Sequence, residues 1–288
     1  MNHKTIVTHN GNFHADDVFS VAALKSIFSS FTLIRTRDLD IIAKADIVID
    51  VGGEYDPETD RFDHHQRGGA GERANGIPYS SFGLMWQKYG LYICQGNQDV
   101  ANAVDADLVS TIDAIDCGHV KGVPEGISLS QTISMFNPTW QEDSHFDSCF
   151  DEAVDFASRV LTRFIATANG GMSAKTIVAN AIDKAQDPRV IVLEKYTPWK
   201  KTVHALSEEA LFMIYPSGTG QWRIQTVPVE PGSFEDRKPL PKKWAGLSDI
   251  ALQDETGIDD AMFCHNGLFI AGAGSFESTM KMAVIALQ

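Results

Sequence analysis

The first part of the chain alternates between strand-like and helix-like runs of apolar residues. Residues 4–9 form a run typical of a buried strand, and residues 15–29 carry apolar side chains at helical spacing. Two more strands are predicted at 31–36 and 46–52, the second apolar on both faces and ended by glycines. This order of strands and helices is typical of a mostly parallel α/β sheet.

The middle of the chain is predicted to be largely helical. The segment 80–90 begins with serines that can cap a helix and ends in a glycine. Longer helices are predicted at 102–116 and 151–168, and a further one at 172–185, because their apolar residues recur at helical spacing.

The pattern changes after Pro188, where short strand-like runs replace long helices. The predicted strands are 189–195, 210–216, 221–228, 260–266 and 269–274, followed by a closing helix at 276–287. The predicted fold class is therefore α/β. An N-terminal domain over 1–187 has a mostly parallel sheet and a helical second half, and a smaller C-terminal α/β domain covers 188–288.

Composition narrows the class of protein. The 288 residues are 43% hydrophobic and 22% charged, as in ordinary globular proteins. No apolar stretch approaches the length of a membrane span and no leader segment is apparent, so the sequence predicts a cytoplasmic protein without membrane contact. The four cysteines form no paired motif, which argues against a zinc ribbon or a disulfide framework. A formal charge of −14 argues against a broad grip on long duplex nucleic acid but does not exclude a phosphate-bearing substrate.

Four clusters of histidine and aspartate stand out in the first 120 residues. They comprise His9, His14, Asp16 and Asp17; Asp50; Asp63, His64 and His65; and Asp113 and Asp116. Each cluster alone has an ordinary explanation, because aspartate often caps a helix or occupies a turn. Two of them follow predicted parallel strands, however, and ligands bind beyond the carboxyl ends of such strands.

Together, the clusters point to a metal centre. Mixed histidine and carboxylate ligands suit Mn²⁺ or Mg²⁺ better than a structural zinc, which favours cysteine. Several carboxylates permit two ions roughly 4 Å apart, a pair that activates water and stabilises displacement at phosphorus. The residues therefore predict a two-metal phosphoesterase.

Longer phrases extend these clusters over nearly the whole chain. They are THNGNFHADD (8–17), IDVGGEYDPETDRFDHHQRG (49–68), IPYSSFGLMW (77–86), DAIDCG (113–118), RKPLPKKWAGL (237–247) and FCHNGLFIAGAGS (263–275). On these phrases the chain resembles the DHH phosphoesterase superfamily, and within it the melanocyte-proliferating-gene family. That family is associated with 3′–5′ RNA exonuclease activity.

The resemblance implies roles for individual residues. His9 and His14 would bind the first ion and Asp16 and His64 the second, with Asp50 bridging the two. Asp116 would be the ligand of the fourth motif. Asp113, one helical turn before Asp116, is the competing ligand. Asp63 would orient a neighbouring histidine, and His65 would face the substrate phosphate or the leaving oxygen.

One departure from the superfamily concerns the first motif. The superfamily usually has His-x-x-x-Asp-x-Asp there, whereas this chain has His9, His14 and Asp16 in a loop one residue longer. A neutral imidazole thus replaces a carboxylate. Mn²⁺ remains the favoured ion, with Mg²⁺ as the alternative.

The second half is expected to bind the substrate across an interdomain cleft. The predicted substrate-binding residues are Arg237, Lys238, His265, Asn266, Gly272 and Gly274, with Arg223 as a weaker candidate. Trp222 and Trp244 could stack on a base, but core packing is the favoured prediction for both.

These observations predict a metal-dependent phosphodiesterase, a 3′–5′ exonuclease that acts on RNA or short oligonucleotides through water activated by two metal ions. One alternative is a phosphoesterase for a small molecule such as a dinucleotide or pyrophosphate. Another is a metal-binding regulatory protein without turnover. A homo-oligomer is left open by the sequence.

Overall fold

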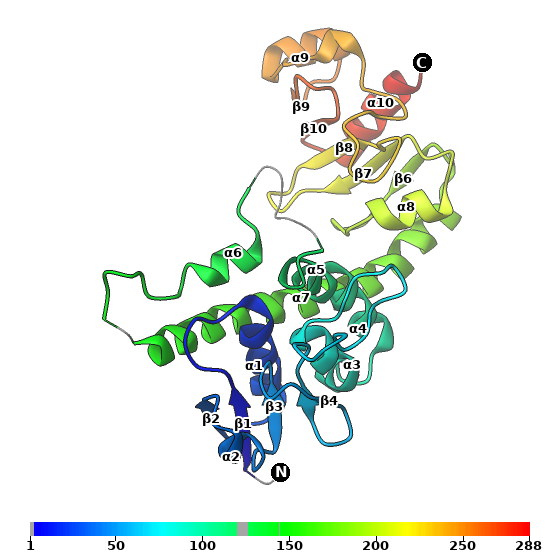
Figure 1. Ribbon diagram of the computed structural model, residues 1–288. Helices are drawn as coiled ribbons and strands as arrows, with labels where there is room; N and C mark the ends of the chain where they lie inside the picture. Colours follow the sequence, from blue (N-terminus) through cyan, green and yellow to red (C-terminus); the bar gives the residue numbers. More distant parts are fainter. Residues whose placement is uncertain (1–2, 120–125, 144) are drawn as a thin grey trace. The chain divides into compact units, whose positions relative to one another are not determined.

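A computed structural model describes residues 3–119, 126–143 and 145–288 (Figure 1). The chain divides into two compact units, an N-terminal unit over Met1–Asn169 and a C-terminal unit over Gly170–Gln288. The division lies within one long helix, α7 (Phe146–Asp183), whereas the boundary placed at residues 187 and 188 follows that helix. Each unit combines a sheet with helices, so the α/β prediction is confirmed.

The sheet of the N-terminal unit has five strands in the order β2-β1-β3-β5-β4. They are β1 (Lys4–Thr8), β2 (Phe31–Arg35), β3 (Ile47–Ile49), β4 (Tyr55–Asp56) and β5 (Arg61–Phe62). β1 pairs in parallel with β2 and β3, and β3 pairs in parallel with β5. Only β4 runs antiparallel to its neighbour, β5. β1 and β3 therefore end at the same edge of the sheet.

Helices pack around this sheet. They are α1 (Ala15–Ile27), α2 (Leu39–Ile42), α3 (Ser81–Ile93), α4 (Gln98–Val104), α5 (Ser110–Asp116) and α6 (Leu129–Ser134). A π-helical turn, Asp105–Val109, joins α4 to α5, so the helix predicted at 102–116 is present with one wide turn inside it. α1 is buried from Ala15 to Leu24 and packs against α3, α5 and α6.

α7 is continuous where the sequence predicted two helices, at 151–168 and 172–185. The expected interruption was at Gly170 and Gly171, and a Cβ built on either glycine meets no atom within 4 Å. A glycine costs a helix only about 1 kcal/mol relative to alanine. Two glycines therefore need not end a helix, and the prediction of two separate helices was wrong.

The C-terminal unit has its own sheet, in the order β6-β7-β8-β10-β9. Its strands are β6 (Val190–Val192), β7 (Phe212–Pro216), β8 (Trp222–Thr226), β9 (Ala261–Cys264) and β10 (Ile270–Ala273). β6 pairs with β7 in parallel, and the remaining pairs are antiparallel. The helices of this unit are α8 (Lys200–Leu206), α9 (Asp249–Thr256), α10 (Phe276–Leu287) and a 3₁₀ turn at Lys242–Trp244.

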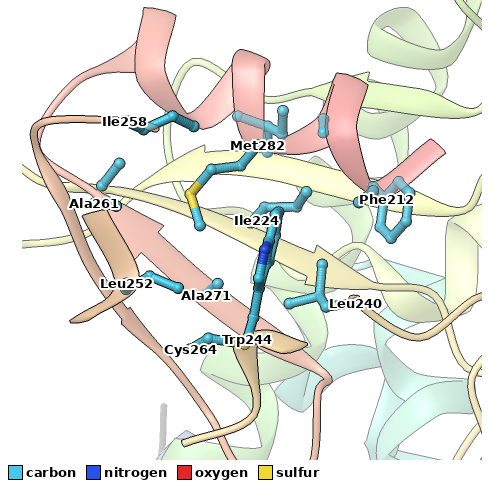
Figure 2. Close-up of a cluster of buried hydrophobic side chains, with 14 of the residues drawn as sticks. Phe212, Ile224, Leu240, Trp244, Leu252, Ile258, Ala261, Cys264, Ala271 and Met282 are labelled. Atoms are coloured by element: carbon cyan, nitrogen blue, oxygen red, sulfur yellow. The ribbon is translucent and has the colours of Figure 1, made fainter. Parts of the chain in front are cut away.

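Both faces of this second sheet are packed. One face contacts α9, α10 and the buried Trp244 in the cluster of Figure 2. The other packs on Trp199 of the α8 segment and on Val178 of α7. Trp244 is only 2% exposed and packs in the core, and the half-buried Trp222 packs against that core, with its ring centroid 4.9 Å from that of Phe276. Among the described residues, no helix is both long and apolar enough to cross a membrane.

Candidate metal centre

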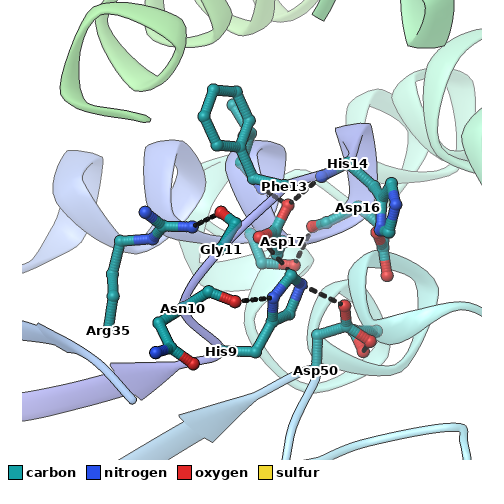
Figure 3. Close-up of polar contacts among 12 residues, drawn as sticks. His9, Asn10, Gly11, Phe13, His14, Asp16, Asp17, Arg35 and Asp50 are labelled. Atoms are coloured by element: carbon teal, nitrogen blue, oxygen red, sulfur yellow. Dashed lines mark hydrogen bonds and ion pairs between the residues drawn. The ribbon is translucent and has the colours of Figure 1, made fainter. Parts of the chain in front are cut away.

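Two predicted ligands meet where neighbouring parallel strands end. His9 follows β1 and Asp50 follows β3, and the strands pair in register through Val7 and Val48. The Nε2 atom of His9 lies 3.2 Å from Oδ2 of Asp50 (Figure 3). Both side chains are almost fully buried. The structure therefore brings together the two residues that sequence reasoning placed at the carboxyl edge of the sheet.

The conformation of Asp50 is fixed from several sides. Its φ of 57° lies in the left-handed region, which is rare for a residue with a side chain and marks positions that their surroundings must hold. Its backbone N–H donates to the carbonyl of Phe62 at 3.0 Å. The Ser81 hydroxyl at the start of α3 donates to Oδ1 at 2.9 Å. These contacts aim the carboxylate of Asp50 at the neighbouring histidines.

The loop between His9 and α1 is held by side chains from distant parts of the N-terminal unit. Arg35 of β2 donates to the carbonyl of Gly11 at 2.7 Å. Asn137 accepts from the backbone N–H of Phe13 at 3.0 Å and donates to the Phe13 carbonyl at 2.9 Å. These contacts fix the long first-motif loop that carries His9 and His14.

The first turn of α1 brings two buried carboxylates into the centre. Asp17 Oδ1 accepts from the backbone N–H groups of His14 and Val18, at 2.9 and 2.8 Å, while Oδ2 lies 3.3 Å from Nε2 of His9. Asp17 thus caps the helix and contacts a predicted ligand, a double role that the sequence assignment missed. Its position beside Asp16 was the only signal.

The Asp63-His64-His65 segment follows β5. Asp63 Oδ2 accepts from the backbone N–H of Gly53 at 2.6 Å, and its Oδ1 accepts from Nδ1 of His65 at 2.8 Å. The His65 side chain is 60% exposed. This is the contact expected of a carboxylate that orients a histidine, although the role itself stays a prediction.

His64 points into the centre, toward three carboxylates. Its Nε2 lies 3.3 Å from Oδ1 of Asp50, 3.3 Å from Oδ2 of Asp116 and 3.8 Å from Oδ2 of Asp16. Its Nδ1 lies 3.7 Å from the Sγ of Cys117. One ring of the third predicted cluster therefore contacts members of the first, second and fourth.

Asp113 and Asp116 occupy different environments. Asp116 ends α5 and faces His64, whereas Asp113 is fully buried and faces α3. Asp113 accepts from the hydroxyl of Ser80 at 2.6 Å, the backbone N–H of Gly83 at 3.1 Å and Nη2 of Arg73 at 2.7 Å. These donors occupy both oxygens of Asp113. The geometry therefore favours Asp116 over Asp113 as the metal ligand.

Burial and mutual repulsion shift the pKa values in this centre. Burial raises the pKa of Asp16 well above its usual range, and the charges of Asp50 and Asp116 raise it further. Burial would also raise the pKa of Asp50, but the close contacts with His64 and His9 outweigh it and hold this pKa below its usual value. Burial lowers the pKa of His64, yet Asp50 and Cys117 more than compensate and raise it to about 10.

The donor set fits divalent cations. Groups of ligand atoms within 4.8 Å of one another are formed by His9, His14 and Asp50; by Asp50, His64 and His65; by His64, Asp116 and Cys117; and by His14, Asp16 and Asp116. Around one ion with bonds of about 2.1 Å, adjacent ligand atoms lie about 3.0–3.4 Å apart, close to the separations observed at Asp50.

Unpartnered buried atoms provide a second test of this fit. Within the described part of the chain, both carboxylate oxygens of Asp16 and Nε2 of His64 are buried without a hydrogen-bond partner. Such groups cost free energy unless they are paired, and a cation among them would provide the pairing. The centre thus has the chemistry of a metal site.

Comparison with known proteins gives the family. A model described as Uncharacterised protein family (UPF0160), with the short name MYG1 exonuc, matches residues 5–287. This chain belongs to the MYG1 family. The bovine and human proteins named MYG1 exonuclease are 35% and 34% identical to it, over 96% of this chain and 83% and 84% of theirs. A fission yeast MYG1 protein is 32% identical over 98% of this chain and 97% of its own length.

The MYG1 assignment confirms the resemblance to the melanocyte-proliferating-gene family of DHH-type hydrolases. It also confirms the prediction of an enzyme, because curated relatives that match this chain over most of their length are named exonucleases.

In this MYG1 family member, the basic residues predicted to bind substrate already have partners. Nη1 of Arg237 donates to the carbonyls of Ser207, Glu208 and Ala210, at 2.8, 3.1 and 3.0 Å. Lys238 donates to the carbonyl of Leu287 at 2.8 Å, at the end of α10. Both side chains therefore brace the C-terminal unit, and their part in substrate binding stays a prediction.

The predicted histidine and glycine segment forms the β9–β10 turn and β10. His265 and Asn266 are exposed, and Nδ1 of His265 accepts from the backbone N–H of Gly267 at 2.9 Å. A Cβ on Gly272 would lie 2.3 Å from Nη1 of Arg223, and one on Gly274 would lie 3.0 Å from Oδ2 of Asp260. Close packing by neighbouring side chains thus explains both glycines, and anion binding there also stays a prediction.

Proposed function

We propose that this chain is a metal-dependent phosphodiesterase that removes nucleotides from the 3′ end of RNA or short oligonucleotides. The observation that carries the proposal is the position of Asp50. This one buried carboxylate is shared by two groups of ligand atoms, one with His9 and His14 and one with His64 and His65. A carboxylate that serves two ions is the expected core of a two-metal phosphoesterase.

The proposed ligands follow from this arrangement. The first ion is assigned to His9, His14 and Asp50, and the second to Asp16, Asp50, His64 and Asp116. When bound, two divalent cations, with Mn²⁺ favoured over Mg²⁺, would lower the pKa of water and neutralise charge on the scissile phosphate.

The protein's own residues orient these groups. Asp63 holds Nδ1 of His65, which leaves the Nε2 of that exposed ring free to meet the phosphate or the leaving oxygen. Ser81 fixes the rotation of the Asp50 carboxylate. Arg35 and Asn137 fix the loop between His9 and α1, so the ligands are positioned before substrate arrives.

The family supports a nucleic-acid substrate, because its curated mammalian members are named exonucleases. The formal charge of −14 fits action at a chain end better than tracking along a duplex. An end-binding enzyme needs few phosphate contacts.

The test uses purified protein with short RNA labelled at its 5′ end, in the presence of Mn²⁺ or Mg²⁺. We expect a ladder of products shortened from the 3′ end, and no cleavage of a circular RNA of the same sequence. Asp50→Asn should abolish the ladder, because asparagine tolerates the left-handed backbone but cannot bridge two cations. Asp99→Asn, an exposed aspartate in the first turn of α4, is the matched control and should retain activity.

A length series separates the alternatives. Fastest turnover on dinucleotides or pyrophosphate, with none on longer RNA, would replace the exonuclease by a small-molecule phosphoesterase. Absence of turnover on all of these substrates with either metal would contradict an enzyme of this class.

A further inference from the structure

The three histidines that contact Asp50 each have a different partner at Nδ1. Nδ1 of His9 lies 3.2 Å from the backbone carbonyl of Asn10. Nδ1 of His65 lies 2.8 Å from the carboxylate of Asp63. Nδ1 of His64 instead lies 3.7 Å from the sulfur of Cys117. Carbonyl and carboxylate partners are the usual ones for a ligating histidine, so the thiol is the exception.

The sulfur lies on the side of the ring opposite to the carboxylates. Nε2 of His64 faces Asp50 and Asp116 at 3.3 Å each, and this atom is buried without a hydrogen-bond partner in the described chain. A neutral imidazole carries its proton on one nitrogen only. If Nδ1 carries the proton, Nε2 presents its lone pair to the carboxylate-lined space.

We infer that Cys117 is a positioning residue for His64: its sulfur accepts the Nδ1–H of the ring and thereby makes Nε2 the metal-binding atom. The inference rests on the proposed metal centre. It adds a residue that acts through His64 and contacts neither substrate nor the reacting atoms.

The local fold explains why Cys117 reaches this position. Cys117 directly follows Asp116 at the end of α5, and its backbone N–H donates to the carbonyl of Asp113 at 2.9 Å. The end of this helix therefore contacts both nitrogens of one ring, Nε2 through Asp116 and Nδ1 through Cys117. Because α5 is anchored to α3 through Asp113, the position of the sulfur is fixed by the core.

A sulfur partner has chemical consequences. Sulfur is a weaker acceptor than a carbonyl or carboxylate, and at 3.7 Å it fixes the ring by its position at Nδ1. Removing the acceptor frees the ring to rotate or to change tautomer. Loss of such an outer partner typically reduces metal affinity about 10–100-fold.

The first experiment measures Mn²⁺ binding by calorimetry, without any nuclease assay. We expect Cys117→Ala to weaken binding about 10–100-fold and Cys117→Ser to restore most of it, because a hydroxyl can accept the same hydrogen bond. Cys149→Ala, a change at another partly exposed cysteine, on α7, is the matched control and should bind as the unmodified chain does. Thermal unfolding of each variant checks that it is folded.

The second experiment reads the tautomer directly in the unmodified chain, so it does not depend on a variant that folds. Nitrogen-15 spectra of the histidine rings, recorded with Mg²⁺ bound, should show His64 protonated at Nδ1. A proton at Nε2 would overturn the inference. So would a cobalt–thiolate charge-transfer band with Co²⁺, because the sulfur would then be a ligand.

The outcomes separate this inference from the proposed function. Unchanged Mn²⁺ affinity in Cys117→Ala, with normal binding by the unmodified chain, removes only the role of Cys117. Absence of divalent-ion binding by the unmodified chain removes both.

Discussion

The hydroxyl of Ser81 donates a 2.9 Å hydrogen bond to Oδ1 of Asp50, the carboxylate proposed to bridge two ions. Ser81 is the first residue of α3, and the start of that helix is held in turn by Asp113 through Ser80 and Gly83. The orientation of Asp50 therefore depends on the placement of α3. This relationship gives the phrase IPYSSFGLMW (77–86) a physical role, because its serines and glycine connect α5 to the centre.

Ser81→Ala should weaken metal binding while leaving the fold intact. The variant removes the only side-chain hydroxyl among the described contacts of Asp50, so the carboxylate gains rotational freedom. We expect roughly 10-fold weaker Mn²⁺ affinity by calorimetry, as for other outer-shell partners. Ser158→Ala, which removes a half-buried hydroxyl on α7 that donates to the Val154 carbonyl, is the control. Equal Mn²⁺ affinities in the two variants would show that Ser81 does not position Asp50.

Asp113→Ala should lower the stability of the fold, whereas Asp116→Ala should weaken metal binding. Asp113→Ala leaves Arg73, Ser80 and Gly83 without their buried acceptor, and we expect about 3 kcal/mol less stability in chemical unfolding. Asp116→Ala removes a carboxylate whose pKa is raised by burial and by Asp50, so the metal-free protein should be no less stable. It should instead lose the thermal stabilisation that Mn²⁺ gives the unmodified chain.

Comparing the two variants thus distinguishes loss of folding stability from loss of a metal ligand. If Asp113→Ala folded normally and lost Mn²⁺ binding, while Asp116→Ala still bound it, the assignment of the ligand would have to be reversed. Circular dichroism of both variants at matched concentration is the control for folding.

Gly83→Ala should destabilise the protein although the substitution lies inside a helix. A Cβ at this position would lie 2.2 Å from Oδ2 of Asp113, which is fixed by Arg73 and cannot move away cheaply. Overpacking of this kind typically costs about 1–3 kcal/mol.

Gly171→Ala is the matched control, because a Cβ there meets nothing within 4 Å and the residue lies inside α7. It should stabilise the protein by roughly 0.5–1 kcal/mol, the usual gain of alanine over glycine in a helix. Chemical unfolding of both variants compares the two free energies. Equal effects would contradict the close approach of α3 and α5.

The position of the centre could be predicted because it follows from strand periodicity. His9 and Asp50 each end an apolar run, and parallel neighbours bring such ends to one edge. Long phrases then predicted His64 and Asp116 as further members. In the structure, Nε2 of His64 lies 3.3 Å from Oδ1 of Asp50 and 3.3 Å from Oδ2 of Asp116. The roles of these residues as metal ligands stay predictions.

Other features could not be predicted from local pattern. β4 and β5 have two residues each, too few for an alternation to be recognised. α2, α6, α8 and α9 are short and lack a long apolar stripe. Asp17 and Cys117 join the centre through a helix cap and a helix end, and such contacts depend on tertiary placement.

The choice between Asp113 and Asp116 shows the same limit. Both lie on α5, one turn apart, and the sequence alone offers each as a ligand. Arg73 decides between them, because its guanidinium contacts Asp113 and Asp105 from a loop 40 residues before Asp113 in the chain. No periodicity connects these residues, so only the folded structure distinguishes the two carboxylates.

Metal affinity should rise as the pH rises toward about 10, the pKa of His64 in the metal-free centre. In the metal-free centre, burial raises the pKa of Asp16 and Asp116, and carboxylate contacts raise that of His64 to about 10, so protons occupy part of the donor set near neutral pH. A divalent cation must displace these protons. Metal binding therefore releases protons, and for that reason the affinity for the metal increases as the pH rises.

Calorimetry in two buffers of different ionisation enthalpy measures the number of protons released on Mn²⁺ binding. We expect at least one near neutral pH, and fewer in His64→Gln, which removes a group whose pKa is raised to about 10. His3→Gln is the control, because His3 is exposed and contacts Ser30 and Thr32 at the far end of β1. Proton uptake, or release that is unchanged in His64→Gln, would show that His64 is not the protonated group that the cation displaces.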